Sequence, residues 1–162
     1  MKVLGVDPGL RVTGYGLIYA SSDEIRLVEA GIIRSTSSLP LERRLMELYT
    51  GLDEVVKEFS PDVLAIEELY SHYKHPKTAV TMGHARGVFF LVAGMANIPV
   101  FSYSATKIKK SITGTGHATK EQIARMICSR LNCEDFNVKA DVTDAIAAAF
   151  CHMNDISHGG VV

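Results

Sequence analysis

The side chains best suited to chemistry in this 162-residue chain are four acidic residues in three separate segments, Asp7, Glu67, Asp141 and Asp144. Asp7 and Glu67 each end an apolar run, and Asp141 and Asp144 stand three residues apart in an alanine-rich segment. A carboxylate in such apolar surroundings is costly to ionise unless positive charge neutralises it. Four of them gathered together would need a divalent cation, which predicts a metal site for phosphate chemistry.

Carboxylate oxygens are hard ligands, which favours Mg²⁺, or Mn²⁺ in its place, over Zn²⁺. A pair of such ions can activate a water molecule and stabilise the leaving oxygen of a phosphodiester, so we expect two ions in the site. The chain has no Walker-type phosphate loop, which excludes nucleotide hydrolysis by that route. Each acid alone has a structural alternative, because Asp7 could belong to a turn and Asp141 could cap a helix.

The elements that must position these acids follow from the periodicity of apolar residues. Strands over residues 2–7, 13–20 and 25–34, joined by short turns, predict an antiparallel meander. Two later strands are expected at 63–66 and 98–102. Helices are expected over 41–59, about 76–95, after Ser104, from a capping box at Thr119 to Leu131, and over about 140–153.

A meander followed by alternating helices and strands predicts an α/β fold in a single domain, residues 1–162. Its five-stranded mixed sheet would hold three antiparallel strands and then parallel strands, with helices on both faces. If the first and fourth strands pair in parallel, Asp7 and Glu67 share the carboxyl edge of the sheet, where sites form. Asp141 and Asp144 lie at positions i and i+3 of the last helix and point the same way.

Basic residues are concentrated in the middle of the chain. Between Leu69 and Lys120 there is no Asp or Glu, so this stretch carries a charge of +7 and the rest of the chain −8. Such segregation predicts a face that meets a polyanion, the alternative being a set of idle, solvated side chains. The seven cations are Lys74, Lys77, Arg86, Lys107, Lys109, Lys110 and Lys120.

The composition is that of an ordinary globular domain. The longest apolar stretch, residues 87–101, is about 15 residues and therefore too short to span a membrane. We read no signal peptide, so a cytoplasmic protein without membrane contact is expected. The cysteines, Cys128, Cys133 and Cys151, form no Cys-x-x-Cys pair, which favours reduced thiols over a zinc site or disulfides.

Four motifs, in the order and spacing of the family, resemble the RuvC Holliday-junction resolvases: residues 5–16 (GVDPGLRVTGYG), 65–68 (AIEE), 83–87 (GHARG) and 140–145 (ADVTDA). The resemblance implies an RNase H-like fold and a homodimer. It implies magnesium-dependent nicking of two opposed strands at a four-way DNA junction, in recombination and repair, leaving 5′-phosphate and 3′-hydroxyl ends. It also implies a branch-migration complex of the RuvA and RuvB type as a partner.

The catalytic tetrad of that family falls on Asp7, Glu67, Asp141 and Asp144. Some members carry His at the last position, and this chain keeps Asp, so an all-carboxylate site is expected. We expect Asp7 to bridge two metal ions, and Glu67 and Asp144 each to complete the coordination of one ion. Asp141 would bind metal or orient the water.

Six residues are predicted to contact DNA. Lys109 and Lys120 match family lysines that approach the DNA backbone. Tyr70 matches an aromatic residue that stacks on an unpaired base, although an edge tyrosine half-buried against the sheet fits its position equally well. Arg86 lies in a strict motif and either contacts DNA or holds a neighbouring helix. The full set is Tyr70, Lys74, Lys77, Arg86, Lys109 and Lys120.

The helix around residues 76–95 is the expected dimer interface. Its second half is apolar on nearly every side, and Gly83, Gly87 and Gly94 permit close backbone approach. A two-fold partner would cover the outer side and would match a junction with two equivalent strands to cut. The alternative is a helix sandwiched within its own domain.

Two other functions remain open on the sequence alone. Asp7, Gly9 and Gly14 also resemble the first phosphate loop of actin-like ATPases, which need a second comparable domain and would be stabilised against heat by ATP. The second alternative is a non-catalytic junction-binding module with a relic metal site, which would bind a junction without nicking it.

Overall fold

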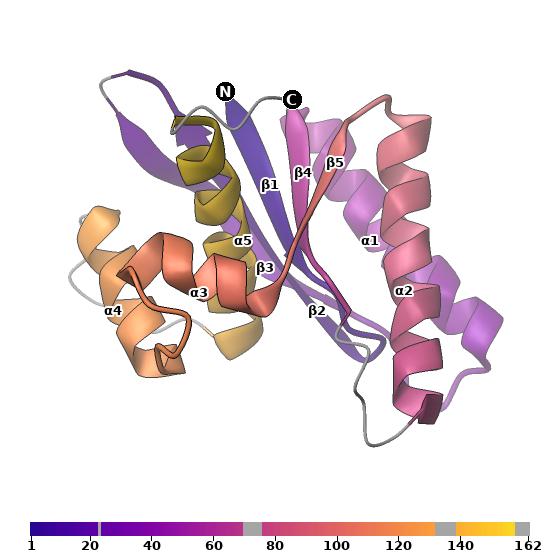
Figure 1. Ribbon diagram of the computed structural model, residues 1–162. Helices are drawn as coiled ribbons and strands as arrows, with labels where there is room; N and C mark the ends of the chain where they lie inside the picture. Colours follow the sequence, from indigo (N-terminus) through magenta and orange to yellow (C-terminus); the bar gives the residue numbers. More distant parts are fainter. Residues whose placement is uncertain (23, 70–75, 132–138, 158–162) are drawn as a thin grey trace.

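A five-stranded mixed sheet forms the centre of the molecule in the computed structural model, which describes residues 1–22, 24–69, 76–131 and 139–157. The strand order is β3-β2-β1-β4-β5, with β1 to β3 antiparallel and β1, β4 and β5 parallel (Figure 1). This is the fold that the sequence predicts. The strands are β1 (Lys2–Asp7), β2 (Val12–Ala20), β3 (Ile25–Arg34), β4 (Val63–Glu67) and β5 (Val100–Tyr103).

Helices cover both faces of the sheet, as expected (Figure 1). One face carries α1 (Leu41–Phe59) and α2 (Pro76–Met95), which also pack against each other. The other face carries α5 (Ala140–Ser157), with α3 (Ala105–Thr113) and α4 (Lys120–Arg130) packed beside it. No helix within the described ranges is both long and apolar enough to cross a bilayer.

The two faces have separate hydrophobic cores, and the alternation of side chains along a strand assigns each residue to one of them. In β1, Val3 lies in the core under α5, whereas Leu4 and Val6 lie in the core under α1 and α2. By the same period of two, Asp7 at the end of β1 falls on the α5 face. In β4, Val63 and Ala65 lie in the α5 core, which assigns Glu67 to that face as well.

Two glycines allow α5 to lie directly on the strands. A Cβ atom added to Gly5 in β1 would stand 1.9 Å from the carbonyl oxygen of Ala145, and one added to Gly14 in β2 would stand 1.9 Å from that of Asp141. Real Cβ atoms never approach so closely, so only glycine fits at these positions. The first turn of α5 is thereby held against the carboxyl end of β1.

Local signals fix several boundaries and leave others to tertiary contacts. Thr119 and Gln122 form the predicted capping box of α4, and the hydroxyl of Ser104 accepts from the N–H of Lys107 at the start of α3. The last helix runs four residues beyond the predicted end at Met153, to Ser157, because its last turn is bound from outside. There Asp155 forms an ion pair with Lys107.

Strand β5 begins at Val100, two residues later than predicted. The N–H of Ile98 is occupied by the carbonyl of Ala93 at the end of α2, at 2.9 Å, and Pro99 has no N–H to donate. Residues 98 and 99 therefore donate no N–H to the sheet, although the carbonyl of Pro99 accepts from the N–H of Leu64 on β4, at 3.0 Å.

Candidate active site at the carboxyl ends of β1 and β4

Three of the four predicted acids line a pocket of about 350 Å³ at the carboxyl edge of the sheet. Asp7 ends β1, Glu67 ends β4, and Asp144 comes from the first half of α5. The parallel register pairs Val6 with Ile66, so Asp7 and Glu67 stand beside each other one position later. Among the other lining residues are Pro8, Glu68, Met82, Lys109 and Lys120.

Asp141 lines an adjoining hollow of about 560 Å³ rather than the pocket itself. Met82 lines both spaces, so they adjoin across this one side chain. Lys77, which the sequence assigns to DNA, lines the same hollow as Asp141, together with Arg11 and Thr81. The four acids are thus distributed over two adjoining depressions.

Burial and mutual repulsion dominate the electrostatics of the pocket. The pKa of Asp7 is raised from 3.8 to about 7, first by burial and then by the negative charges of Asp144, Glu67 and Asp141. The pKa of Glu67 is also raised, first by burial and then by the charge of Asp144. Burial and the neighbouring carboxylates therefore make Asp7 and Glu67 harder to ionise, as expected for groups that need a cation.

Two lysines supply positive charge to this cluster. The Nζ atom of Lys120 lies 2.7 Å from Oδ2 of Asp144, and the hydrogen bond between them raises the pKa of Lys120. The charges of Lys120 and Lys109 lower the pKa of Glu67, which partly opposes the effect of burial. Lys109 and Lys120, two of the four lysines that the sequence assigns to DNA, thus stand at the acids.

The chemistry of the donor set fits Mg²⁺ or Mn²⁺. Asp7, Glu67 and Asp144 offer only carboxylate oxygens, and burial and mutual repulsion raise the pKa of Asp7 and Glu67, so a cation would stabilise their charged forms. Within the described ranges, no group of three or more Asp, Glu, His or Cys side chains is arranged so that it could hold a metal ion as it stands. Asp7, Glu67 and Asp144 line a shared pocket without being gathered around one point, and Lys120 stands beside Asp144.

The other predicted DNA-contacting residues fall in different places. Arg86 is half-buried and donates hydrogen bonds to the carbonyl of Glu67 and the hydroxyl of the exposed Ser102. Tyr70 and Lys74 lie outside the described residues, so their predicted roles remain predictions.

Sequence reasoning missed one residue that shapes the loop after Asp7. The hydroxyl of buried Thr13 donates to the carbonyl of Gly9 at 2.7 Å and accepts from the N–H of the same residue at 3.2 Å. These bonds fix the turn between β1 and β2, next to Asp7. A hydroxyl residue inside an apolar strand was the available signal, because such a buried group must find a partner.

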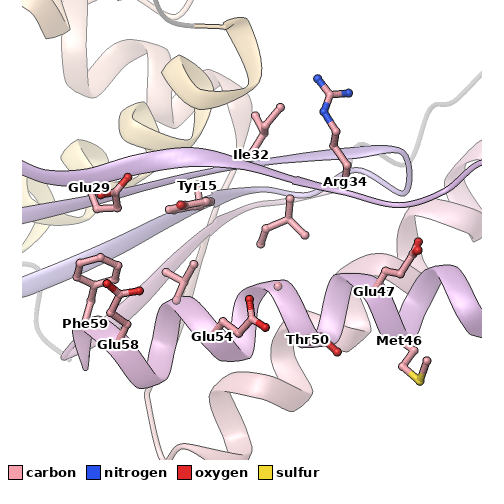
Figure 2. Close-up of a pocket in the computed structure, with 13 residues that line it drawn as sticks. Tyr15, Glu29, Ile32, Arg34, Met46, Glu47, Thr50, Glu54, Glu58 and Phe59 are labelled. Carbon is pink, nitrogen blue, oxygen red and sulfur yellow. The ribbon is translucent and has the colours of Figure 1, made fainter.

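The sequence also gave no sign of a second, larger hollow, about 590 Å³, between α1 and the outer strands β2 and β3. Figure 2 shows Glu54 and Glu58 on α1 facing the strands that carry Glu29 and Tyr15. Burial first, and then the charges of Glu29 and Glu58, raise the pKa of Tyr15. This groove is acidic too, but it lies at the opposite edge of the sheet from Glu67.

Comparison with known proteins identifies the family. The family model described as "Crossover junction endodeoxyribonuclease RuvC" matches residues 3–152. A protein of that name from Rhodopirellula baltica is 45% identical over 149 residues, 92% of this chain and 84% of the relative. Another, from Caldicellulosiruptor saccharolyticus, is 43% identical over 154 residues, 94% of this chain and 92% of the relative.

The chain belongs to the RuvC family. The resemblance inferred from the four motifs is thereby confirmed, and the actin-like alternative is set aside.

Solved RuvC structures share its fold. Thermus thermophilus RuvC in complex with a Holliday junction substrate matches with a TM-score of 0.89 at 25% identity, covering 98% of this chain and 97% of that one. A further structure of Thermus thermophilus RuvC matches with a TM-score of 0.90 at 28% identity, with the same coverage. A yeast mitochondrial Holliday junction resolvase has the same fold, with a TM-score of 0.70 at 15% identity.

Proposed function

We propose that this RuvC-family chain is an endodeoxyribonuclease that resolves four-way DNA junctions by paired, symmetric nicks. The single observation that carries the proposal is the meeting of Asp7, Glu67 and Asp144 in one pocket rimmed by Lys109 and Lys120. Repelling carboxylates suit a divalent cation, and adjacent lysines suit a phosphate backbone. The pocket therefore combines the two charges that hydrolysis of a phosphodiester requires.

Asp7 is the centre of the proposed site, because the charges of Glu67, Asp141 and Asp144 all act on it. We assign Asp7 to both ions of a pair and Glu67 and Asp144 to one ion each. Asp141, in the adjoining hollow, would bind metal or orient the water. When bound there, Mg²⁺ would activate the attacking water and stabilise the leaving 3′ oxygen. The ends produced would be a 5′-phosphate and a 3′-hydroxyl.

Positive residues on both sides of Asp7 give the DNA strand its proposed course. Lys109 and Lys120 rim the pocket, and Lys77 lines the hollow beside Asp141. A strand that follows these lysines would cross the carboxylates, where the scissile phosphate must lie. Lysines at such positions fix the register of the backbone and add no sequence preference.

The outer side of α2 supports a homodimer. Ala85, Phe89 and Val92 are buried under the helix, yet Leu91 and Met95 are 56% and 64% exposed. Nothing lies within 4 Å of a Cβ atom added to Gly87 or Gly94, so a second helix could approach closely there. An apolar surface of this kind favours burial against a second copy, whose two-fold axis would serve two opposed strands. A branch-migration complex of the RuvA and RuvB type is proposed as a partner from the family alone.

The test is cleavage of a mobile synthetic four-way junction with each strand labelled in turn, in Mg²⁺ or in EDTA, beside a linear duplex of the same sequence. We expect nicks at symmetric positions in two opposed strands, only with the metal and only in the junction. Binding without nicking across a sequence-varied set of junctions would favour the non-catalytic module. Failure to bind any junction would contradict the assignment of the basic face.

A further inference from the structure

Arg86 connects three elements at the edge of the proposed active site. It lies on α2, and its Nε atom donates to the carbonyl oxygen of Glu67 at the end of β4, at 3.3 Å. Its Nη2 atom donates to the hydroxyl of Ser102 on β5, at 2.6 Å. The guanidinium also lies over the ring of Phe90, one helical turn along α2, at 4.6 Å from the ring centre. One side chain thus joins α2 to the ends of two parallel strands.

The surroundings of Arg86 are those of a bridge between elements at the edge of the fold. The group is half-buried, and burial lowers its pKa, whereas the nearby charge of Glu68 favours its charged form. It donates hydrogen bonds to a backbone carbonyl and to the hydroxyl of the exposed Ser102. The planar fork of arginine can make both bonds at once, which a lysine ammonium on a flexible stem cannot reproduce with the same geometry.

The position of Glu67 explains what the bridge is for. Glu67 is the last residue of β4, and its carboxylate must be held against Asp7 although the regular ladder ends there. On one side, the N–H of Glu68 bonds to the carbonyl of Tyr103 on β5. Arg86 binds the carbonyl of Glu67 in the same peptide unit. The peptide group that follows the carboxylate is therefore held through both its N–H and its C=O.

We propose that Arg86 is a positioning residue for Glu67. It fixes the peptide group at the end of β4 and so orients the Glu67 carboxylate for metal, rather than contacting DNA. Because Phe90 is 37% exposed on the same helix that carries the proposed dimer surface, the bridge also links that surface to the metal site. This inference rests on the proposed metal-dependent nuclease function.

The first measurement is the affinity of the DNA-free protein for Mn²⁺, followed by electron paramagnetic resonance, in Arg86→Ala, Arg86→Lys and Ser102→Ala. We expect roughly tenfold weaker binding in Arg86→Ala, as is typical when a group that orients a metal ligand is removed. Arg86→Lys should be weakened similarly, since it keeps the charge but loses the fork. Ser102→Ala should be weakened less, and the double variant with Arg86→Ala should be no weaker than Arg86→Ala alone.

The second measurement is junction binding in EDTA as a function of salt, for the same variants. If Arg86 is a positioning residue, the affinity should stay within about twofold of the starting protein and the slope of log affinity against log salt should stay the same. If Arg86 contacts a phosphate, Arg86→Ala should lower the magnitude of that slope by about one, and Arg86→Lys should restore it. That second pattern, or an unchanged Mn²⁺ affinity in both Arg86 variants, would overturn the proposal.

The matched control is Arg43→Ala, which removes the same charge from the exposed first turns of α1. It should change neither measurement. The thermal unfolding temperature of every variant shows whether weaker metal binding comes from misfolding or from misplacement of Glu67. If Arg86→Ala does not fold, Arg86→Lys and Ser102→Ala still test the proposal. Because metal affinity is measured without DNA, a protein that fails to cleave junctions would contradict the nuclease function and leave the bridge testable.

Discussion

The molecule has two acidic hollows, and they differ in how their carboxylates are held. The groove between α1 and β3 carries Glu29, Glu47, Glu54 and Glu58 (Figure 2). Two of these acids have local donors, because Glu47 accepts from the N–H and hydroxyl of Thr36 and Glu29 accepts from the N–H of Ala30. In the pocket at β1 and β4, Asp7 is instead buried beside other negative charges. Convergence and burial, rather than the number of acids, distinguish a candidate metal site.

The largest expected effect is at the centre of the pocket. Asp7→Asn should lower the rate of junction cleavage by more than about 100-fold, because the ligand assigned to both ions loses its charge. Junction binding should persist or tighten, since a charge that repels phosphate is gone. Cleavage assays and binding in EDTA check the two halves, and retained cleavage would contradict the four-carboxylate site.

A second difference between the two regions is the cost of adding a methyl group at a closely packed glycine. Gly5→Ala should destabilise the fold by about 3 kcal/mol, because the new methyl group meets the carbonyl of Ala145 in α5 and neither backbone can give way. A Cβ atom at Gly51 in α1 would stand 2.6 Å from Cγ2 of Ile33, so the buried Ile33 side chain, rather than backbone, would have to shift. Alanine also favours the helix by about 1 kcal/mol, which offsets part of that cost, so we expect a smaller loss than in Gly5→Ala. Chemical denaturation measures both, and equal losses would contradict this contrast.

The charge of Asp7 should make the metal-free protein less stable as the pH rises. Its folded pKa, about 7, lies above the 3.8 of an ordinary Asp, so the unfolded state ionises first and stability falls between about pH 4 and pH 7. The full difference between the folded and unfolded pKa values of Asp7 corresponds to about 4 kcal/mol in the free energy of unfolding. We expect roughly half of this loss, because the pocket is open to solvent. Asp7→Asn should be more stable than the starting protein at pH 8, and this difference in stability should disappear near pH 4. Thermal unfolding in EDTA tests this, and parallel pH profiles would count against it.

The lysines at the pocket should contribute to the salt dependence of junction binding. Lys109→Ala should weaken junction binding and lower its salt slope by about one, as expected when one phosphate contact is lost. An unchanged slope would make Lys109 an idle surface residue.

The smallest effect is expected in the groove. Glu54→Gln with Glu58→Gln should leave junction cleavage within about twofold of the starting protein, because these exposed acids lie in the groove on the α1 face, whereas the pocket lies on the α5 face and salt screens exposed charges. A loss comparable to that of Asp7→Asn would mean that the wrong acidic hollow has been chosen as the site.

Periodicity and capping made most of the fold predictable. The apolar stripe of α1 and the capping box at Thr119 are local signals, and both elements lie where they were predicted. The alternation along β1 and β4, together with their parallel pairing, was enough to bring Asp7 beside Glu67. These features depend on residues close in sequence or on one pairing rule.

What the sequence could not supply depends on contacts between distant segments. Arg86 was assigned to DNA with a neighbouring helix as the alternative, and only the meeting of α2 with β4 and β5 shows that its donors turn inward. The pairing of Lys120 with Asp144 joins two helices 24 positions apart, and no local pattern encodes it. The groove of Figure 2 arises from the spacing between α1 and the sheet, and no residue type in the sequence predicts this spacing.

The seating of α5 on β1 also has a consequence for the newly made chain. The first strand carries Asp7, but Asp141 and Asp144 follow more than 130 residues later. During synthesis the sheet and the first four helices can emerge before α5 docks against Gly5 and Gly14. A nascent or truncated chain that lacks α5 would therefore carry an incomplete set of carboxylates. The genome would be protected from an unfinished nuclease by the order in which its parts leave the ribosome.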